Sequence, residues 1–231
     1  MSEVVSDIYE KKVKCPNCSN AFKTMKVRSS RLRVSKRDAD YFVMYSNEHM
    51  PLFFNPIKCP KCGFASLDEK FNKALLPVER KIINDKIKTL EYYVDYSGER
   101  NLDQSLELYK YCFIVAQKLD NSYLLLGKIA HRIAWHYRIL EDDVNEREYL
   151  ILARECYKSA YSKEDLNNCN MDELTLAFLI AELNRRTEEY KDAINWFSRI
   201  VSNRGVKSKP GLENQAREQL QLAKEAFDAL K

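Results

Sequence analysis

Two short cysteine pairs, CPNC at 15–18 and CPKC at 59–62, carry the clearest chemistry in this sequence. Two residues between paired cysteines allow one turn of backbone to bring both sulfurs to about 2.3 Å from a zinc ion, so each pair supplies half of a tetrahedral site. Gly63 after the second pair can adopt the left-handed conformation of a tight zinc knuckle, whereas Ser19 holds that place after the first pair. We expect one structural Zn²⁺ ion, held by Cys15, Cys18, Cys59 and Cys62.

Three other uses of these cysteines compete with a structural zinc site. A thioredoxin-like dithiol needs one pair within a βαβ pattern, and neither pair has that pattern around it. A disulfide framework is typical of secreted proteins, but residues 1–14 lack a secretory apolar segment, and seven cysteines leave one over. A hydrolytic zinc needs water in place of one thiolate and a general base, and the sequence near both pairs offers no base. The other cysteines are expected to be core or loop residues: Cys112, Cys156 and Cys169.

The composition is that of a globular protein with one large or two modest domains. Of the 231 residues, 45% are hydrophobic, which is enough to bury a substantial core, and 5 Gly and 6 Pro argue against a low-complexity chain. No apolar run approaches the roughly 20 residues of a membrane span. The net charge of +4 is uneven, because residues 1–66 hold twelve Lys and Arg against six Asp and Glu, and the remainder carries −2.

The segment between the cysteine pairs has the periodicity of strands. Apolar and polar residues alternate over 23–28 and 31–36, and 41–45 is rich in β-formers. We expect residues 1–66 to form a small antiparallel β module that zinc staples together.

This alternation places a row of basic side chains on one face of the β module if its first two strands pair. A basic stripe with aromatic residues close by is typical of a nucleic-acid-binding surface. The alternative is a solvated sheet face whose arginines pair with Asp38, Asp40 and the helical part of the chain. The stripe comprises Lys26, Arg28, Arg31, Arg33 and Arg37.

The string VRSSRLRVSKRDADYFVMY at 27–45, followed by CPKCGFA at 59–65, resembles the uncharacterised bacterial family catalogued as domain of unknown function 2225. The resemblance covers the N-terminal third closely and the helical remainder more loosely. It implies a bacterial, cytoplasmic origin, and it supplies no activity. It also implies that the family's metal positions are Cys15, Cys18, Cys59 and Cys62.

After Leu67 the apolar periodicity becomes helical, so residues 67–231 are expected to form an all-α domain of about seven helices. Residues 189–197 resemble the second helix of a tetratricopeptide repeat (TPR), with Ala193 and Phe197 at its small and large packing positions. Fainter copies occur earlier, including one at Ser105 and Tyr109, with irregular spacing. An unrelated right-handed helical stack is the alternative. The expected helices are 69–95, 102–119, 122–140, 146–161, 171–186, 189–201 and 212–230.

Stacked repeats of this kind curve into a groove lined by the first helix of each pair. The expected lining is mostly basic with two aromatic residues, and it suits an acidic peptide or a carboxylate terminus, because arginine grips a carboxylate bidentately and tryptophan anchors a side chain. The alternative is ordinary packing, with Trp135 against the preceding hairpin. The lining residues are Lys128, His131, Trp135, Arg138, Phe178, Glu182 and Arg185.

The sequence therefore predicts an α+β protein: a zinc-stapled antiparallel β module followed by a TPR-like array of helical hairpins. With no catalytic constellation, we expect a cytoplasmic, non-enzymatic adaptor that binds a protein or acidic peptide in the groove. The rival hypothesis is a nucleic-acid-binding protein that uses the basic stripe around Arg31 and Arg33.

Overall fold

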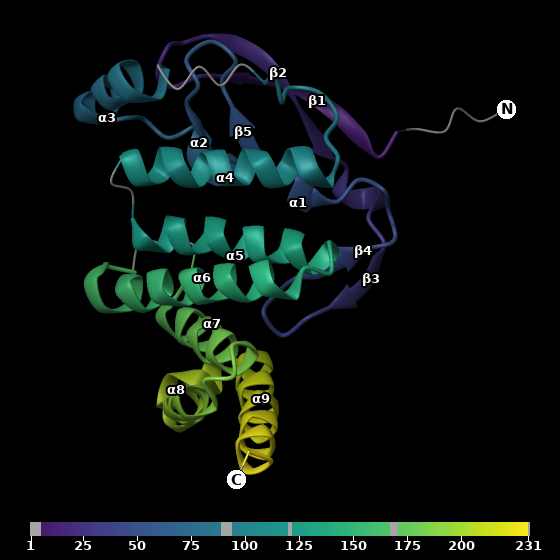
Figure 1. Ribbon diagram of the computed structural model, residues 1–231, viewed down its shortest axis with the longest axis vertical. Coiled ribbons are helices and arrows are strands. Elements are labelled where there is room, and N and C mark those ends of the chain that lie inside the picture. Colours follow the sequence, from purple (N-terminus) through teal and green to yellow (C-terminus); the bar gives the residue numbers. More distant parts are fainter. Residues whose placement is uncertain (1–5, 89–93, 120–121, 167–170, 231) are drawn as a thin grey trace, which may run out of the picture. The chain divides into compact units, whose positions relative to one another are not determined.

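The computed structural model describes residues 6–88, 94–119, 122–166 and 171–230, which fall into two compact units. Unit 1 is drawn from Met1–Arg37 and Val43–Asn121, and unit 2 from Asp38–Phe42 and Ser122–Lys231. Unit 1 contains small antiparallel β-hairpins and the four paired cysteines, and unit 2 contains an array of packed helices (Figure 1), which confirms the predicted fold class. The division differs from the expected boundary after residue 66.

Among the described residues of unit 1, the β part consists of three separate two-stranded hairpins. The strands expected at 23–28 and 31–36 do not pair with each other; each pairs with a different strand, and Ser29–Arg31 form a 3₁₀ turn between them. The first strand was not predicted, since the adjacent polar residues Lys11 and Lys12 interrupt its alternation. The antiparallel pairs are β1 (Ile8–Lys14) with β2 (Ala21–Val27), β3 (Val34–Arg37) with β4 (Val43–Tyr45), and β5 (Pro56–Lys58) with β6 (Ala65–Leu67).

The single helix predicted at 69–95 is wrong within the described residues, and 89–93 lie outside them. Helix α2 ends at Phe71, and Pro77 opens a new helix, since proline has no N–H and is tolerated only in the first turn. The short helices are α1 (Pro51–Phe54), α2 (Asp68–Phe71) and α3 (Pro77–Ile82), which continues as a π-helical turn at Ile83–Ile87.

Helix α4 (Leu102–Lys118) completes the core of unit 1 by packing on β5, β6 and α1. The Tyr109 hydroxyl donates to the Leu52 carbonyl at 3.1 Å, and the Tyr109 ring is fully buried. Ser105 is also fully buried. These two residues, expected to mark a third repeat, therefore belong to the core of unit 1.

Unit 2 is a succession of helices in which each helix packs on the next. Ser122, Asp142 and Asp172 cap the first three by accepting a hydrogen bond from a backbone N–H, as short polar side chains do at helix starts. Of the described helices in either unit, none is long and apolar enough to span a membrane. The helices are α5 (Tyr123–Ile139), α6 (Asp143–Lys163), α7 (Glu173–Arg186), α8 (Tyr190–Ser202) and α9 (Pro210–Asp228), close to the predicted ranges.

Helix α6 packs closely against α5 at Gly127. A Cβ atom there would lie 2.5 Å from the ring of Tyr157, which is 1% exposed and has no room to move. We expect Gly127→Ala to destabilise unit 2 by about 1–2 kcal/mol, because overpacking outweighs the higher helix propensity of alanine.

The matched control is Gly211→Ala in α9, where a Cβ would meet nothing within 4 Å. Both tryptophans of the chain, Trp135 and Trp196, lie in unit 2, so tryptophan fluorescence during urea unfolding reports on that unit alone. Equal urea midpoints for Gly127→Ala and the wild type would contradict the expectation.

Candidate metal centre and segment-binding surface

The four paired cysteines converge at one point in unit 1. Their sulfurs all lie within 4.8 Å of one another, and the Sγ atoms of Cys15 and Cys62, like those of Cys18 and Cys59, are 3.6 Å apart. Tetrahedral coordination at 2.3 Å requires sulfurs about 3.8 Å apart. The separations suit one metal ion and exceed a disulfide bond of about 2.05 Å.

Each cysteine pair forms the turn of a hairpin, and the two turns have the same hydrogen bonds. The N–H of Ser19 donates to the Cys15 carbonyl, and that of Gly63 donates to the Cys59 carbonyl, both at 3.0 Å. Ser19 has φ 58° and Gly63 has φ 74°, so Ser19 adopts the left-handed conformation expected of glycine. The two knuckles thus present their sulfurs equivalently to a shared centre.

Helix α4 supports the second knuckle directly. The Tyr111 hydroxyl donates to the Gly63 carbonyl at 2.9 Å, and a Cβ on Gly63 would lie 2.8 Å from that hydroxyl oxygen. Glycine at position 63 therefore serves both the left-handed turn and the close approach of α4.

The four cysteine sulfurs have the chemistry of a cation-binding site. Three of the sulfurs are buried, and hydrogen bonds with Cys59 and Cys62, together with burial, raise the pKa of Cys15. Hydrogen bonds from Cys15 and Cys59 lower the pKa of Cys62 to about 2, so the cluster shares its protons unequally. A divalent cation bound here would replace those protons and compensate for the charge of the thiolates, which are soft ligands suited to zinc or iron.

The basic stripe is not assembled as expected. Lys26 pairs with Asp68 at 3.0 Å and donates to the Phe54 carbonyl, while Arg28 lies over the Tyr9 ring. The remaining members are exposed on or near the separate hairpin of β3 and β4: Arg31, Arg33 and Arg37.

In unit 2, most of the residues expected to line a groove gather around a segment of the same chain. The segment is Asp38–Phe42, called the acidic segment below, and it joins β3 to β4. We call the side chains of α5 and α7 that contact it the segment-binding surface. These are His131, Trp135, Arg138, Phe178 and Arg186.

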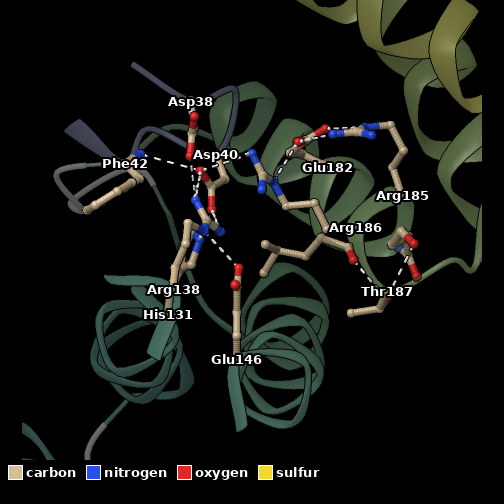
Figure 2. Close-up of polar contacts among 12 residues, drawn as sticks. Asp38, Asp40, Phe42, His131, Arg138, Glu146, Glu182, Arg185, Arg186 and Thr187 are labelled. Carbon is tan, nitrogen blue, oxygen red and sulfur yellow. Dashed lines mark hydrogen bonds and ion pairs between the residues drawn. The ribbon is translucent and has the colours of Figure 1, made fainter. Parts of the chain in front are cut away.

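Asp40 is the fully buried centre of this contact (Figure 2). Arg138 donates to both of its carboxylate oxygens, at 3.1 and 2.7 Å. The Trp135 indole N–H donates to Oδ2 at 3.1 Å, and His131 Nε2 lies 3.2 Å from the same atom. The Arg186 guanidinium adds an ion pair at 3.5 Å. The Asp40 carboxylate therefore interacts with four side chains.

The aromatic residues of the acidic segment pack on the same surface. The Tyr41 ring stacks on Phe178 with centroids 5.8 Å apart, and Phe42 lies against Trp135 at 5.7 Å. The Arg138 guanidinium lies 5.4 Å from the centre of the Phe42 ring. Charge recognition and aromatic packing are therefore combined within five residues of chain.

The three other residues predicted for the groove act indirectly or lie elsewhere. Glu182 is fully buried and accepts from Arg185 at 2.9 and 2.7 Å and from Arg186 at 2.8 Å, which orients Arg186 towards the acidic segment (Figure 2). Lys128 is half-buried on α5, and its role stays a prediction.

Sequence reasoning missed Arg186 and Glu146. Arg138 donates to Glu146 Oε1 at 2.7 Å, which fixes the guanidinium from the side opposite Asp40. The position of Arg186 four residues after Glu182 on one helix was the available signal, because side chains at that spacing meet.

Burial and charge set the protonation of this cluster. Burial alone would raise the pKa of Asp40, but the hydrogen bonds from His131 and Arg138, together with the charge of Arg138, hold it well below its ordinary value. Burial lowers the pKa of His131 below 6.5 despite its hydrogen bond with Asp40. At neutral pH the carboxylate is therefore ionised, and a neutral imidazole donates its Nε2–H.

Asp40, His131 and Tyr157 form a carboxylate–imidazole–hydroxyl chain, with His131 Nδ1 3.4 Å from the Tyr157 oxygen. Such a relay occurs in enzymes, but these three residues are at most 2% exposed. A substrate cannot reach the hydroxyl, so the chain fixes the tautomer of His131.

Unit 2 should lose stability in mild acid because of His136. Burial lowers the pKa of this fully buried imidazole from 6.5 to about 4. A depressed folded-state pKa gives stability that is complete above pH 6.5 and is lost as pH falls towards 4. We expect a loss of about 2 kcal/mol between pH 7.5 and pH 5.

Urea unfolding followed by tryptophan fluorescence at these two pH values measures that loss, and His136→Gln should reduce it. His131, whose pKa burial also lowers, adds to the loss in the same pH window, whereas Asp40 contributes only below about pH 4, where unfolded aspartate becomes protonated. Identical unfolding curves at pH 7.5 and pH 5 would rule this account out.

A family model described as "Uncharacterized protein conserved in bacteria (DUF2225)" matches residues 8–223. The chain belongs to the DUF2225 family. This confirms the resemblance seen at 27–45 and 59–65. A relative from Borreliella burgdorferi, described as "Uncharacterized protein", is 26% identical over 175 residues, which cover 68% of this DUF2225 chain and 62% of the relative. The chain thus spans less than two thirds of that relative. No solved structure matches this DUF2225 chain.

Proposed function

We propose that this DUF2225 protein is a non-enzymatic, zinc-binding adaptor whose segment-binding surface binds an acidic peptide of a partner protein. One observation supports the proposal: Trp135, Arg138 and Phe178, which the sequence places in a peptide-binding groove, contact the acidic segment of the same chain. A surface that desolvates a carboxylate and supplies several donors to it has the chemistry of peptide recognition.

The zinc site has a structural role in this proposal. Four thiolates saturate tetrahedral zinc and leave no position for water, so the ion supports folding rather than hydrolysis. Metal analysis of the purified protein should give one zinc per chain. Iron in place of zinc would contradict the assignment of the metal, and the peptide proposal would be unaffected.

An immobilised array of twelve-residue acidic, neutral and basic peptides tests the adaptor function with the full chain. We expect binding to acidic peptides with neighbouring aromatic residues, and a loss of at least tenfold for Arg186→Ala. Arg199→Ala, an exposed arginine of α8, is the matched control. Equal binding by wild type and Arg186→Ala would overturn the proposal.

Nucleic-acid binding is a second candidate, favoured by the exposure of Arg31, Arg33 and Arg37. A titration with labelled RNA and DNA at several salt concentrations tests it, since each neutralised phosphate adds about 0.9 to the slope of log affinity against log salt. Binding that is lost in Arg31→Glu/Arg33→Glu, but kept in the exposed control Lys73→Glu/Lys81→Glu, would establish it. Absence of binding at low salt would remove it.

A further inference from the structure

We propose that the acidic segment is a built-in competitor, and that the external ligand is a peptide with the same arrangement: two carboxylates two residues apart followed by two aromatic side chains. This inference rests on the proposed function and adds its regulation and its recognition motif. The acidic segment occupies the surface in the resting protein, and a partner peptide must displace it.

The carboxylates account for the first part of the motif. Arg138 binds both of them, since its Nη1 donates to Asp38 at 2.8 Å while its Nη1 and Nη2 donate to Asp40. Arg186 lies 3.9 Å from Asp38 and 3.5 Å from Asp40. Figure 2 shows both guanidiniums directed at the acidic segment. Two arginines shared by two carboxylates require the acidic groups at this spacing.

The aromatic residues account for the second part. Phe42 is 2% exposed, between Trp135 and Arg138, whereas Tyr41 on Phe178 is 37% exposed. The last position is therefore enclosed and should demand an aromatic ring. The position before it should tolerate other flat side chains.

The acidic segment attaches through side chains in a way that a separate peptide can reproduce. Its described backbone bonds are internal: Asp38 N–H donates to the Phe42 carbonyl at 2.9 Å, and Tyr41 N–H donates to the Asp38 carbonyl at 3.1 Å. A free peptide that forms the same turn can present the same groups to α5 and α7.

The acidic segment also carries backbone strain that a partner can avoid. Tyr41 has φ 67°, in the left-handed region that bulky side chains rarely adopt. A ligand with glycine or asparagine at this position can form the turn with less strain. Such a ligand loses the stacking of Tyr41 on Phe178 but keeps the contacts of both carboxylates and of Phe42.

Tethering gives the acidic segment a large advantage over a free copy of itself. A segment linked to its binding surface has an effective concentration in the millimolar range. If it occupies the surface 99% of the time, the apparent affinity for a free peptide falls about 100-fold. The wild type should therefore bind the free copy weakly, and weakening the tethered segment should restore binding.

Fluorescence anisotropy with a labelled peptide spanning residues 36–45 tests this in the full chain. We expect Asp40→Asn, which weakens the tethered segment and leaves α5 and α7 unchanged, to bind the peptide at least tenfold more tightly than the wild type. Phe42→Ala, a second weakened variant, should show the same gain. The peptide carrying Asp40→Asn should fail to bind either variant. Tryptophan-monitored unfolding verifies that each variant is folded.

The outcomes separate this inference from the proposed function. Equal affinity of wild type and both variants, with binding lost in Arg186→Ala, would overturn the competitor and leave the adaptor function standing. No peptide binding to a folded variant would overturn both. Light scattering measures whether the protein is a monomer or a dimer. If the wild type is a dimer and the Asp40→Asn variant is a monomer, the acidic segment binds a second copy of the chain, and its role as a tethered competitor is overturned.

Discussion

Removal of the metal from the four-cysteine site is expected to unfold unit 1 and to leave unit 2 folded. The sulfurs of Cys15, Cys18, Cys59 and Cys62 tie two hairpins together, and α4 packs on the second of them. Structural zinc contributes on the order of 10 kcal/mol to folding, which is as large as the whole stability of a typical domain. Unit 1 should therefore not fold without the ion.

Hydrogen exchange by mass spectrometry, before and after treatment with a chelator, measures this effect in each unit separately. Amides of Ile57, Lys58, Ala65–Leu67 and α4 should lose protection, while α5 to α9 keep theirs. Cys59→Ser should reproduce the effect, and Cys156→Ser in α6 is the matched control. Unchanged protection of unit 1 after complete removal of the metal would show that the cysteines do not hold a structural ion.

Arg138→Ala is expected to destabilise unit 2 by about 3–5 kcal/mol. It leaves the Asp40 carboxylate, which is fully buried, without its bidentate partner, and an unpaired buried charge is far more costly than an intact pair is stabilising. Glu146 also loses its partner. Tryptophan fluorescence during urea unfolding reports the change directly.

Asp40→Ala/Arg138→Ala provides the internal control. Because both charges are removed together, the double variant should cost clearly less than the sum of the two single variants. Arg204→Ala, at an exposed arginine just after α8, should cost less than about 0.5 kcal/mol. Additive costs in the double variant would show that Asp40 and Arg138 do not act as a pair.

The clustering of the four paired cysteines could be predicted from the sequence, because the spacing that brings the two sulfurs of each pair together is local. Two residues between cysteines, and a left-handed residue after them, nearly determine a knuckle. The helices of unit 2 were accessible because the 3.6-residue period and caps such as Ser122 and Asp172 mark them. The error at 69–95 came from reading periodicity through Pro77, which begins a separate helix.

The sequence does not predict which part of the chain occupies the segment-binding surface, because the contacts join residues about a hundred positions apart. Aspartates such as Asp38 and Asp40 are typical of turns, and both do lie in a turn. Nothing near them in the sequence predicts that Arg138, 98 residues further along the chain, contacts Asp40 in space. Helical periodicity placed His131, Trp135 and Arg138 on one face; it did not reveal what covers that face.

The most direct test of peptide recognition by unit 2 is hydrogen exchange of the acidic segment itself, with and without a saturating acidic–aromatic peptide. A peptide that binds the segment-binding surface must displace Asp38–Phe42, so the amides of Tyr41 and Phe42 should exchange at least tenfold faster, and a peptide with both carboxylates replaced by amides should have no effect. Unchanged exchange in the presence of bound peptide would place the binding site elsewhere and contradict the recognition of acidic peptides by α5 and α7.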